Sequence, residues 1–228
     1  MTIQKRFTKR ADDIEETLNL VKFIANIESH RNLPITFGEG SELYVSQEMQ
    51  CALKAQFLVV LYNIVESTVC DCLNSFYDSI ADDNLTFADL SDEMRDMWKK
   101  YLKRTSNPDF KKNDTELMGM TIRFERLAVN ISGSLDIRKI VDVFSEHGCR
   151  LDETNREKYS NSFLVVKNKR NNLAHGNVSF SECGSNYLVS DLEKFKSDIL
   201  DGMQEVVTQA KEYISNKEYK RNCSGLFP

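Results

Sequence analysis

The sequence predicts an all-α fold in which residues 1–228 form one domain. Apolar residues recur at helical spacing along most of the chain, and only three prolines and nine glycines interrupt it. Charged residues make up 29% of the chain and are mixed with the 41% that are hydrophobic, a balance typical of a soluble, helix-rich globular protein. No internal repeat, low-complexity segment or linker divides the sequence. We therefore expect a single helical core.

The first expected helix covers residues 10–30. Ile14 and Leu18 fall on one apolar face, which Leu20 widens, and acidic residues in the first turn interact favourably with the helix dipole. His30 lies near the end of this helix, where a cation is favourable. We therefore expect His30 to have a structural role.

Residues 48–80 give the strongest helical signal in the chain, because apolar residues occur on nearly all sides of the expected helix. Such a helix is central and buried. Its string L-Y-N-I-V-E-S-T places Asn63 and Glu66 in apolar surroundings, where an unpaired carboxylate is costly. Two interpretations stay open. Glu66 lies on a narrow solvent-exposed edge, or Glu66 or Asn63 contacts an arginine from elsewhere in the chain.

A further helix is expected over residues 91–104, ended by Asn107-Pro108. One of its sides is apolar, and the other is the most basic part of an acidic protein, with Lys99, Lys100, Lys103 and Arg104. A solvated helical face explains these charges, and contact with an RNA backbone is the alternative. Residues 113–134 show no clear pattern.

The last third of the chain is expected to contain three helices and a tail. Helical spacing over residues 135–147 ends at His147, which we interpret as a structural cation near a helix end. A capping box at residues 154–157 starts the next helix. The remaining segments are a loop or a short hairpin over residues 178–189, a long amphipathic helix over residues 190–213, and a frayed basic tail over residues 217–228.

Composition and charge argue against several classes of function. The net charge of −5 and the pI near 5.4 oppose a general attraction to nucleic acid or to an anionic membrane. The N-terminal residues do not resemble a secretory signal, so we expect a cytoplasmic protein with six reduced cysteines. No run of about 18 apolar residues occurs to cross a bilayer. No Cys/His or carboxylate cluster has metal-ligand spacing, so we expect no metal and no other cofactor.

The residues that could carry out chemistry are concentrated in the stretch from Ser162 to Phe180, S-F-L-V-V-K-N-K-R-N-N-L-A-H-G-N-V-S-F. On a helix, Asn171 and His175 are separated by about 40° around the axis, and Arg170 and His175 by about 140°. Histidine exchanges protons near neutral pH, arginine binds phosphate through two hydrogen bonds, and asparagine can orient either group. In the alternative interpretation, the arginine and the histidine only interact with the helix dipole.

The string V-V-K-N-K-R-N-N-L-A-H-G resembles the signature of the HEPN superfamily, in which four to six residues separate an arginine from a histidine. The resemblance is nearest to stand-alone bacterial HEPN proteins of defence and toxin systems. It extends to L-Y-N-I-V-E-S-T and to S-G-S-L-D…E-H-G, and so covers most of the chain. It implies an up-and-down helical bundle that dimerises and brings two motif helices together at a composite cleft.

Many members of that superfamily are metal-independent endoribonucleases. By this resemblance, His175 transfers protons while the ribose 2′-hydroxyl attacks the adjacent phosphate, and the products carry a 2′,3′-cyclic phosphate. Arg170 stabilises the phosphorane, and Asn171 positions the histidine or the phosphate. Glu66 and Asn63 become candidates for bracing Arg170. The candidate RNA-binding residues are Lys167, Lys169, Lys99, Lys100, Lys103 and Arg104.

The resemblance also implies partners: an RNA substrate, a second copy of the chain, and an antitoxin or defence-system protein. The net charge and the lack of a long apolar run predict no membrane partner. Toxins of this superfamily often carry a tyrosine two residues after the motif histidine. Asn177 occupies that position here, which argues against control by tyrosine modification. The alternative function is a non-catalytic HEPN-type dimerisation module whose groove binds a partner protein or a nucleotide, with Arg170 as an anion clamp.

Overall fold

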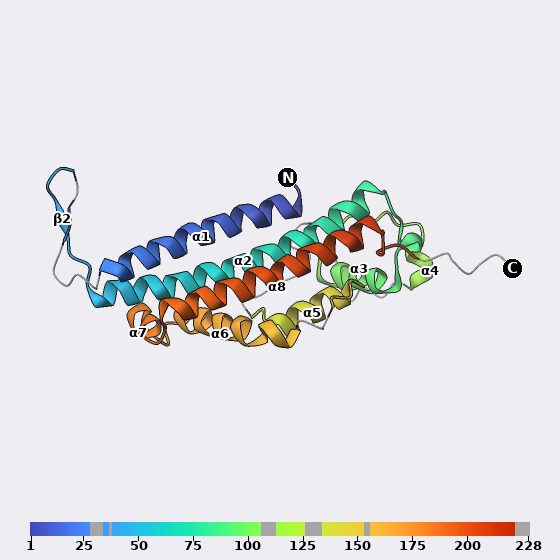
Figure 1. Ribbon diagram of the computed structural model, residues 1–228. Helices are drawn as coiled ribbons and strands as arrows, with labels where there is room; N and C mark the ends of the chain where they lie inside the picture. Colours follow the sequence, from blue (N-terminus) through green and yellow to red (C-terminus); the bar gives the residue numbers. More distant parts are fainter. Residues whose placement is uncertain (28–33, 37, 106–112, 126–133, 153–155, 222–228) are drawn as a thin grey trace.

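The computed structural model describes residues 1–27, 34–36, 38–105, 113–125, 134–152 and 156–221. Three long helices run side by side along an elongated molecule (Figure 1): α1 (Ile3–Ile27), α2 (Gln47–Asp82) and α8 (Val189–Ser215). The other elements are β1 (Ile35–Thr36), β2 (Glu42–Leu43), the 3-10 helix η2 (Phe87–Asp89), α3 (Asp92–Thr105), α4 (Asp114–Leu117), α5 (Ile137–Glu146), α6 (Arg156–Ala174) and α7 (Phe180–Ser185). The all-α prediction is confirmed, since the two strands in the described residues have two residues each.

The long helices run up and down. α1 is antiparallel to α2 and α8, and α6 packs antiparallel against the same two helices (Figure 1). Contacts across α1 and α8 fix this direction: Gln4 exchanges hydrogen bonds of 2.8 and 3.2 Å with Gln204, while Glu15 pairs with Lys196. The arrangement is the helical bundle that the sequence predicts.

α2 is the core of this bundle. Ser46 caps its start, because the side-chain oxygen accepts the N–H of Met49 at 3.2 Å. Sixteen of its 36 residues are buried, and each large apolar side chain so buried contributes about 1.5–3 kcal/mol. Among the described helices, α2 alone is long and apolar enough to span a membrane, but 56% of its most apolar window is buried inside the protein. The predicted central helix is therefore the structural core.

One side of α1 carries apolar side chains that do not join this core. Leu20 is 52% exposed and Phe23 is 58% exposed, whereas Leu18 and Val21 are buried. The expected apolar stripe is thus narrower than predicted, because α1 contacts α2 and α8 on one side only. His30, the structural cation expected after this helix, lies outside the described residues.

The segment that follows α6 is a helix, so the expected loop or short hairpin over residues 178–189 is wrong. Ser179 caps α7 by accepting the N–H of Glu182 at 3.2 Å. Gly184 lies so close to α2 that a Cβ built on it falls 1.7 Å from the carbonyl oxygen of Cys51. The glycine that indicated a turn instead allows two helices to pack closely. A small hairpin does occur earlier, where Ile35 pairs with Leu43.

The start of the expected frayed tail is packed against the bundle. The carboxylate of Asp83, at the end of α2, contacts Lys217 and Lys220 at 2.9 Å and accepts the hydroxyl of Tyr219 at 3.0 Å. The Tyr219 ring is buried. Residues 217–221 therefore differ from the prediction, and residues 222–228 lie outside the described part of the chain.

His147 is structural, as expected, but for a different physical reason. Its Nε2 lies 2.6 Å from the hydroxyl of Tyr77, its Nδ1 lies 2.7 Å from the carbonyl oxygen of Val143, and the side chain is 1% exposed. Burial lowers the pKa of His147, and this effect exceeds that of the bond to Val143, which acts in the opposite direction. The residue is therefore a neutral core histidine rather than a cation at the helix end.

Candidate active site

The C-terminus of α6 places His175 at the protein surface. The helix ends at Ala174, and Gly176 adopts a positive φ of 69°, which a residue with a Cβ adopts only with strain. The N–H of Asn177 donates to the carbonyl of Asn172 at 2.9 Å, and the N–H of Gly176 donates to that of Leu173 at 3.2 Å. These two bonds form a Schellman motif. His175 is thus the exposed residue immediately after a firmly closed helix end.

Arg170 lies one helical turn earlier and is held from three directions. Its Nη2 is 3.5 Å from the Oε2 of Glu66 on α2, and its Nη1 donates to the Oδ1 of Asn171 at 3.2 Å. The guanidinium carbon lies 4.8 Å from the centre of the Tyr62 ring, within the range of a cation–π contact. The side chains of Arg170 and Glu66 are 27% and 22% exposed, so the pair is shielded yet open to a ligand.

Tyr62 is the residue at this site that the sequence analysis missed. It is one turn before Glu66 on α2 and only 1% exposed. Its hydroxyl accepts the N–H of Leu135 at 2.9 Å. Burial, with a smaller contribution from the negative charge of Glu66, raises the pKa of Tyr62 to about 12, although the Leu135 bond and Arg170 act against this rise. A signal existed in the four-residue spacing of Tyr62 and Glu66, which puts both on one helix face.

The other candidate residues of this region lie on α2 and α6, and two of them contact other side chains of the same chain. Asn63 is exposed on α2, one turn before Glu66. Lys167 pairs with Asp136 at 2.8 Å, where both side chains are largely shielded. The Nζ of Lys169 lies 5.8 Å from the centre of the Tyr187 ring.

The basic residues of α3 lie elsewhere. α3 packs against α5, toward the end of the bundle opposite α7, whereas the end of α6 lies beside α7 (Figure 1). Lys99 pairs with Asp114 at 2.6 Å and Lys100 with Glu146 at 3.2 Å, while Lys103 and Arg104 are exposed. Neither of these exposed cations lies next to Arg170.

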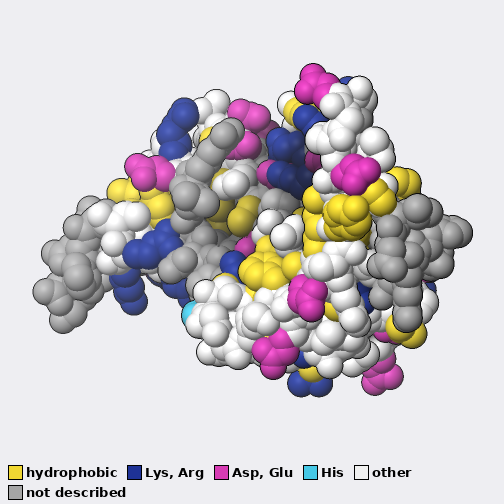
Figure 2. Space-filling view, turned by 90° about the vertical axis from the view of Figure 1, so that its left-hand side faces the viewer, with side chains coloured by type: hydrophobic (Ala, Val, Ile, Leu, Met, Phe, Trp, Pro, Cys, Tyr) yellow, Lys and Arg dark blue, Asp and Glu magenta, His cyan; other side chains and the backbone are white. Residues whose placement is uncertain are grey.

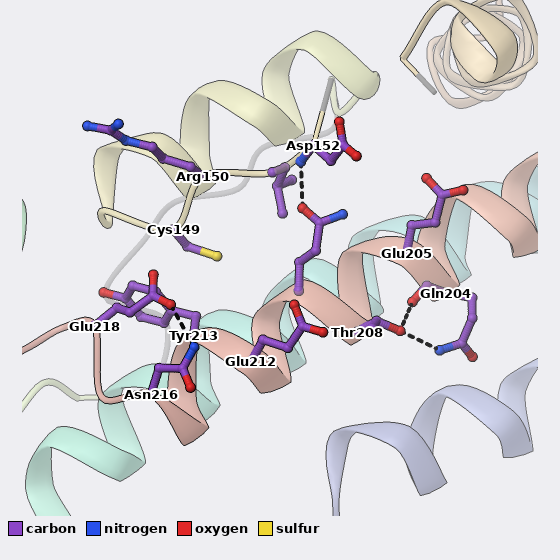
Figure 3. A pocket seen from close by; sticks show the side chains of 12 residues that line it. Cys149, Arg150, Asp152, Gln204, Glu205, Thr208, Glu212, Tyr213, Asn216 and Glu218 are labelled. Atoms are coloured by element: carbon purple, nitrogen blue, oxygen red, sulfur yellow. Dashed lines mark hydrogen bonds between the residues drawn. The ribbon is translucent and has the colours of Figure 1, made fainter. Parts of the chain in front are cut away.

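The described residues contain no group of three or more His, Cys, Asp or Glu side chains that could hold a metal ion. A cavity of about 510 Å³ lies between α8 and residues 149–152 (Figure 3). Its walls carry carboxylates from Asp152, Glu205, Glu212 and Glu218. Neither Arg170 nor His175 lines this cavity, so the cavity is separate from the candidate site.

Comparison with known proteins identifies the family. The model of the MAE_28990-like HEPN family matches residues 1–219. No curated protein and no solved structure matches the chain. Because the match includes α2, α6 and the site between them, the protein belongs to the HEPN superfamily, as a member of the MAE_28990-like HEPN family.

Proposed function

We propose that the protein is a metal-independent endoribonuclease of the HEPN type. The observation that carries this proposal is the shielded Arg170, held by Glu66 and Tyr62 one turn before the exposed His175. An arginine held in one place can stabilise negative charge as it develops on a phosphate. A histidine that is free in solvent can transfer protons. Family membership is a second, independent support.

The reaction needs one base and one acid. His175 takes the proton of the ribose 2′-hydroxyl, whose oxygen then attacks the adjacent phosphorus. Arg170 stabilises the phosphorane, and Asn171, which accepts a hydrogen bond from Arg170, keeps the guanidinium in place. The bond from phosphorus to the 5′-oxygen breaks, and a second imidazolium donates a proton to that oxygen. The products are a 2′,3′-cyclic phosphate and a 5′-hydroxyl.

A second copy of the chain supplies the second histidine. The outward face of α6 supports this step, because its exposed positions from Asn161 to His175 are uncharged: Asn161, Leu164, Asn168, Asn172, Ala174 and His175. A two-fold interface sets one surface against itself, and amides can both donate and accept hydrogen bonds there. Figure 2 shows further hydrophobic side chains on the end of the molecule that faces the viewer. Leu188, which precedes α8, and Tyr44, which follows β2, are exposed apolar residues.

The cellular setting is part of the same proposal. HEPN membership supports a cytoplasmic role in a bacterial defence or toxin–antitoxin system, with an antitoxin or defence protein as partner. Asn177 follows the motif histidine at the position where regulated toxins often carry tyrosine. We therefore do not expect tyrosine modification at that position to control this protein.

The test is RNA cleavage without metal. Wild type, His175→Ala and Arg170→Ala are incubated with total RNA in EDTA, with Asp142→Ala on the exposed face of α5 as control. Wild type and the control should cut RNA, and each site variant should lose about 100-fold or more of the rate. Intact RNA with wild type, or equal cleavage by His175→Ala, would contradict the assignment. A solution mass near 26.3 kDa would contradict the shared site.

A second function is favoured by one observation. Three of the candidate RNA-binding lysines, Lys99, Lys100 and Lys167, are already in ion pairs with carboxylates of the same chain. With a net charge of −5, this leaves little positive surface for RNA. A non-catalytic HEPN module that binds a partner protein or a nucleotide through Arg170 is the alternative. It predicts that wild type leaves RNA intact in the same assay.

A further inference from the structure

Arg170 can stabilise a phosphorane only if its guanidinium plane is fixed. The side chain has several rotatable bonds and about 2 kcal/mol of rotamer entropy in solution. Its polar contacts among the described residues, Nη2 with Glu66 at 3.5 Å and Nη1 with Asn171 at 3.2 Å, hold two edges of the guanidinium but place nothing against its face. A flat surface under the guanidinium is needed to fix the plane as well.

The Tyr62 ring provides this surface. The guanidinium carbon lies 4.8 Å from the ring centre, and the ring is almost completely buried. A buried ring cannot rotate away from its neighbours without disturbing the packing around it. The aromatic face therefore supports the guanidinium from the protein side, while the Arg170 side chain remains 27% exposed.

The ring is anchored at both ends. Its Cα belongs to the buried helix α2, and its hydroxyl accepts the N–H of Leu135 at 2.9 Å. The next residue, Asp136, caps α5 by accepting the N–H of Lys139 and pairs with Lys167 of α6 at 2.8 Å. The turn at residues 135–136 thus joins α2 to the helix that carries Arg170. The raised pKa of Tyr62 keeps its hydroxyl neutral, so the ring adds no negative charge beside a phosphate.

We propose that Tyr62 is a positioning residue of the ribonuclease site, whose buried ring fixes the plane of the Arg170 guanidinium. The inference rests on the proposed ribonuclease function, although the order of the Arg170 side chain can be measured without any activity. The same geometry gives Lys167 a structural role in the anchor, in place of the RNA contact expected from the sequence.

Two variants separate the ring from the hydroxyl. Tyr62→Leu removes the aromatic face, and Tyr62→Phe keeps the face but leaves the Leu135 N–H without its acceptor. We expect Tyr62→Leu to lower kcat about tenfold with little change in KM, because a cation–π contact acts on the plane of Arg170 rather than on RNA affinity. Tyr62→Phe should retain most of the rate. Equal kcat values for wild type and Tyr62→Leu would overturn the proposal.

A nuclear magnetic resonance measurement on the wild type removes the dependence on activity and on the folding of a variant. The Nε–H proton of Arg170, assigned by its loss in Arg170→Lys, should be shifted upfield by the ring current of Tyr62. The shift should persist in Tyr62→Phe. An Arg170 signal at the position of a freely rotating arginine would show that the ring does not hold it. If the wild type does not cut RNA but its Arg170 signal is shifted, the proposed ribonuclease function is contradicted and the positioning of Arg170 by Tyr62 is not.

Discussion

Gly184→Ala tests the closest approach of two helices in the bundle. An ideal Cβ at this position falls 1.7 Å from the carbonyl oxygen of Cys51 and 2.6 Å from its carbonyl carbon. Real Cβ atoms stay at least 3.0 Å from such neighbours, so α7 must move away from α2 by more than about 1 Å. Both obstructing atoms belong to the backbone of the core helix and cannot rotate aside.

The expected loss in the free energy of unfolding for Gly184→Ala is at the upper end of the range for overpacked interiors. Inserting a methyl group into a packed interior typically costs about 1–3 kcal/mol, and we expect about 3 kcal/mol because the backbone cannot yield. The displacement also exposes Cys183, which is buried next to the glycine. In a chain of this length, about 3 kcal/mol corresponds to a decrease in Tm of about 6–12 °C.

Urea unfolding monitored by circular dichroism measures this loss in the free energy of unfolding. Gly119→Ala is the matched control, since no atom lies within 4 Å of a Cβ at that position and its φ is not in the left-handed region. That control should change the free energy of unfolding by less than about 0.5 kcal/mol. A Gly184→Ala protein as stable as Gly119→Ala would refute the close packing of α7 on α2.

Two further predictions concern the helix end and the buried histidine. Gly176→Ala should lower the free energy of unfolding by about 1 kcal/mol, because φ is 69° although no atom obstructs the new Cβ. The substitution should also slow RNA cleavage by displacing His175. Unchanged unfolding and cleavage would contradict this. Because the pKa of His147 is lowered in the folded state, the unfolded chain binds a proton at this residue near pH 6.5 more readily than the folded protein does. The urea midpoint should therefore fall as the pH decreases below about 6.5, and His147→Phe should remove this component.

Local patterns in the sequence predicted the longer helices but not the short helices α4 and α7, nor which helices pack together. The all-round apolar pattern of residues 48–80 identified the core helix, and Gly176 marked the end of the motif helix correctly. Residues 178–189 around Gly184 were predicted as a loop or a short hairpin, because a glycine that allows close packing looks the same in a sequence as one in a loop. The packing of Tyr219 against Asp83 joins positions 136 residues apart, so no local pattern could indicate it.

The candidate site was predictable to the extent that its residues are unusual for their surroundings. A carboxylate in an apolar helix requires a partner, and this requirement led to Glu66 before its distance to Arg170 was known. Tyr62 was missed because an aromatic residue in an apolar run is ordinarily part of a core, and only the packing of α6 on α2 places a cation on its face. Lys167, which the sequence suggested as an RNA contact, pairs with Asp136, a partner 31 positions away that no local pattern indicated.

Analysis of the RNA ends tests the central claim most directly. RNA cut by wild type in EDTA is examined by mass spectrometry for the groups at the new termini, with His175→Ala treated in parallel. Attack by the ribose 2′-hydroxyl at a site built from Arg170 and His175 predicts 2′,3′-cyclic phosphate and 5′-hydroxyl ends that are absent from the His175→Ala sample. New 5′-phosphate ends, or cyclic phosphate ends that persist in His175→Ala, would contradict it.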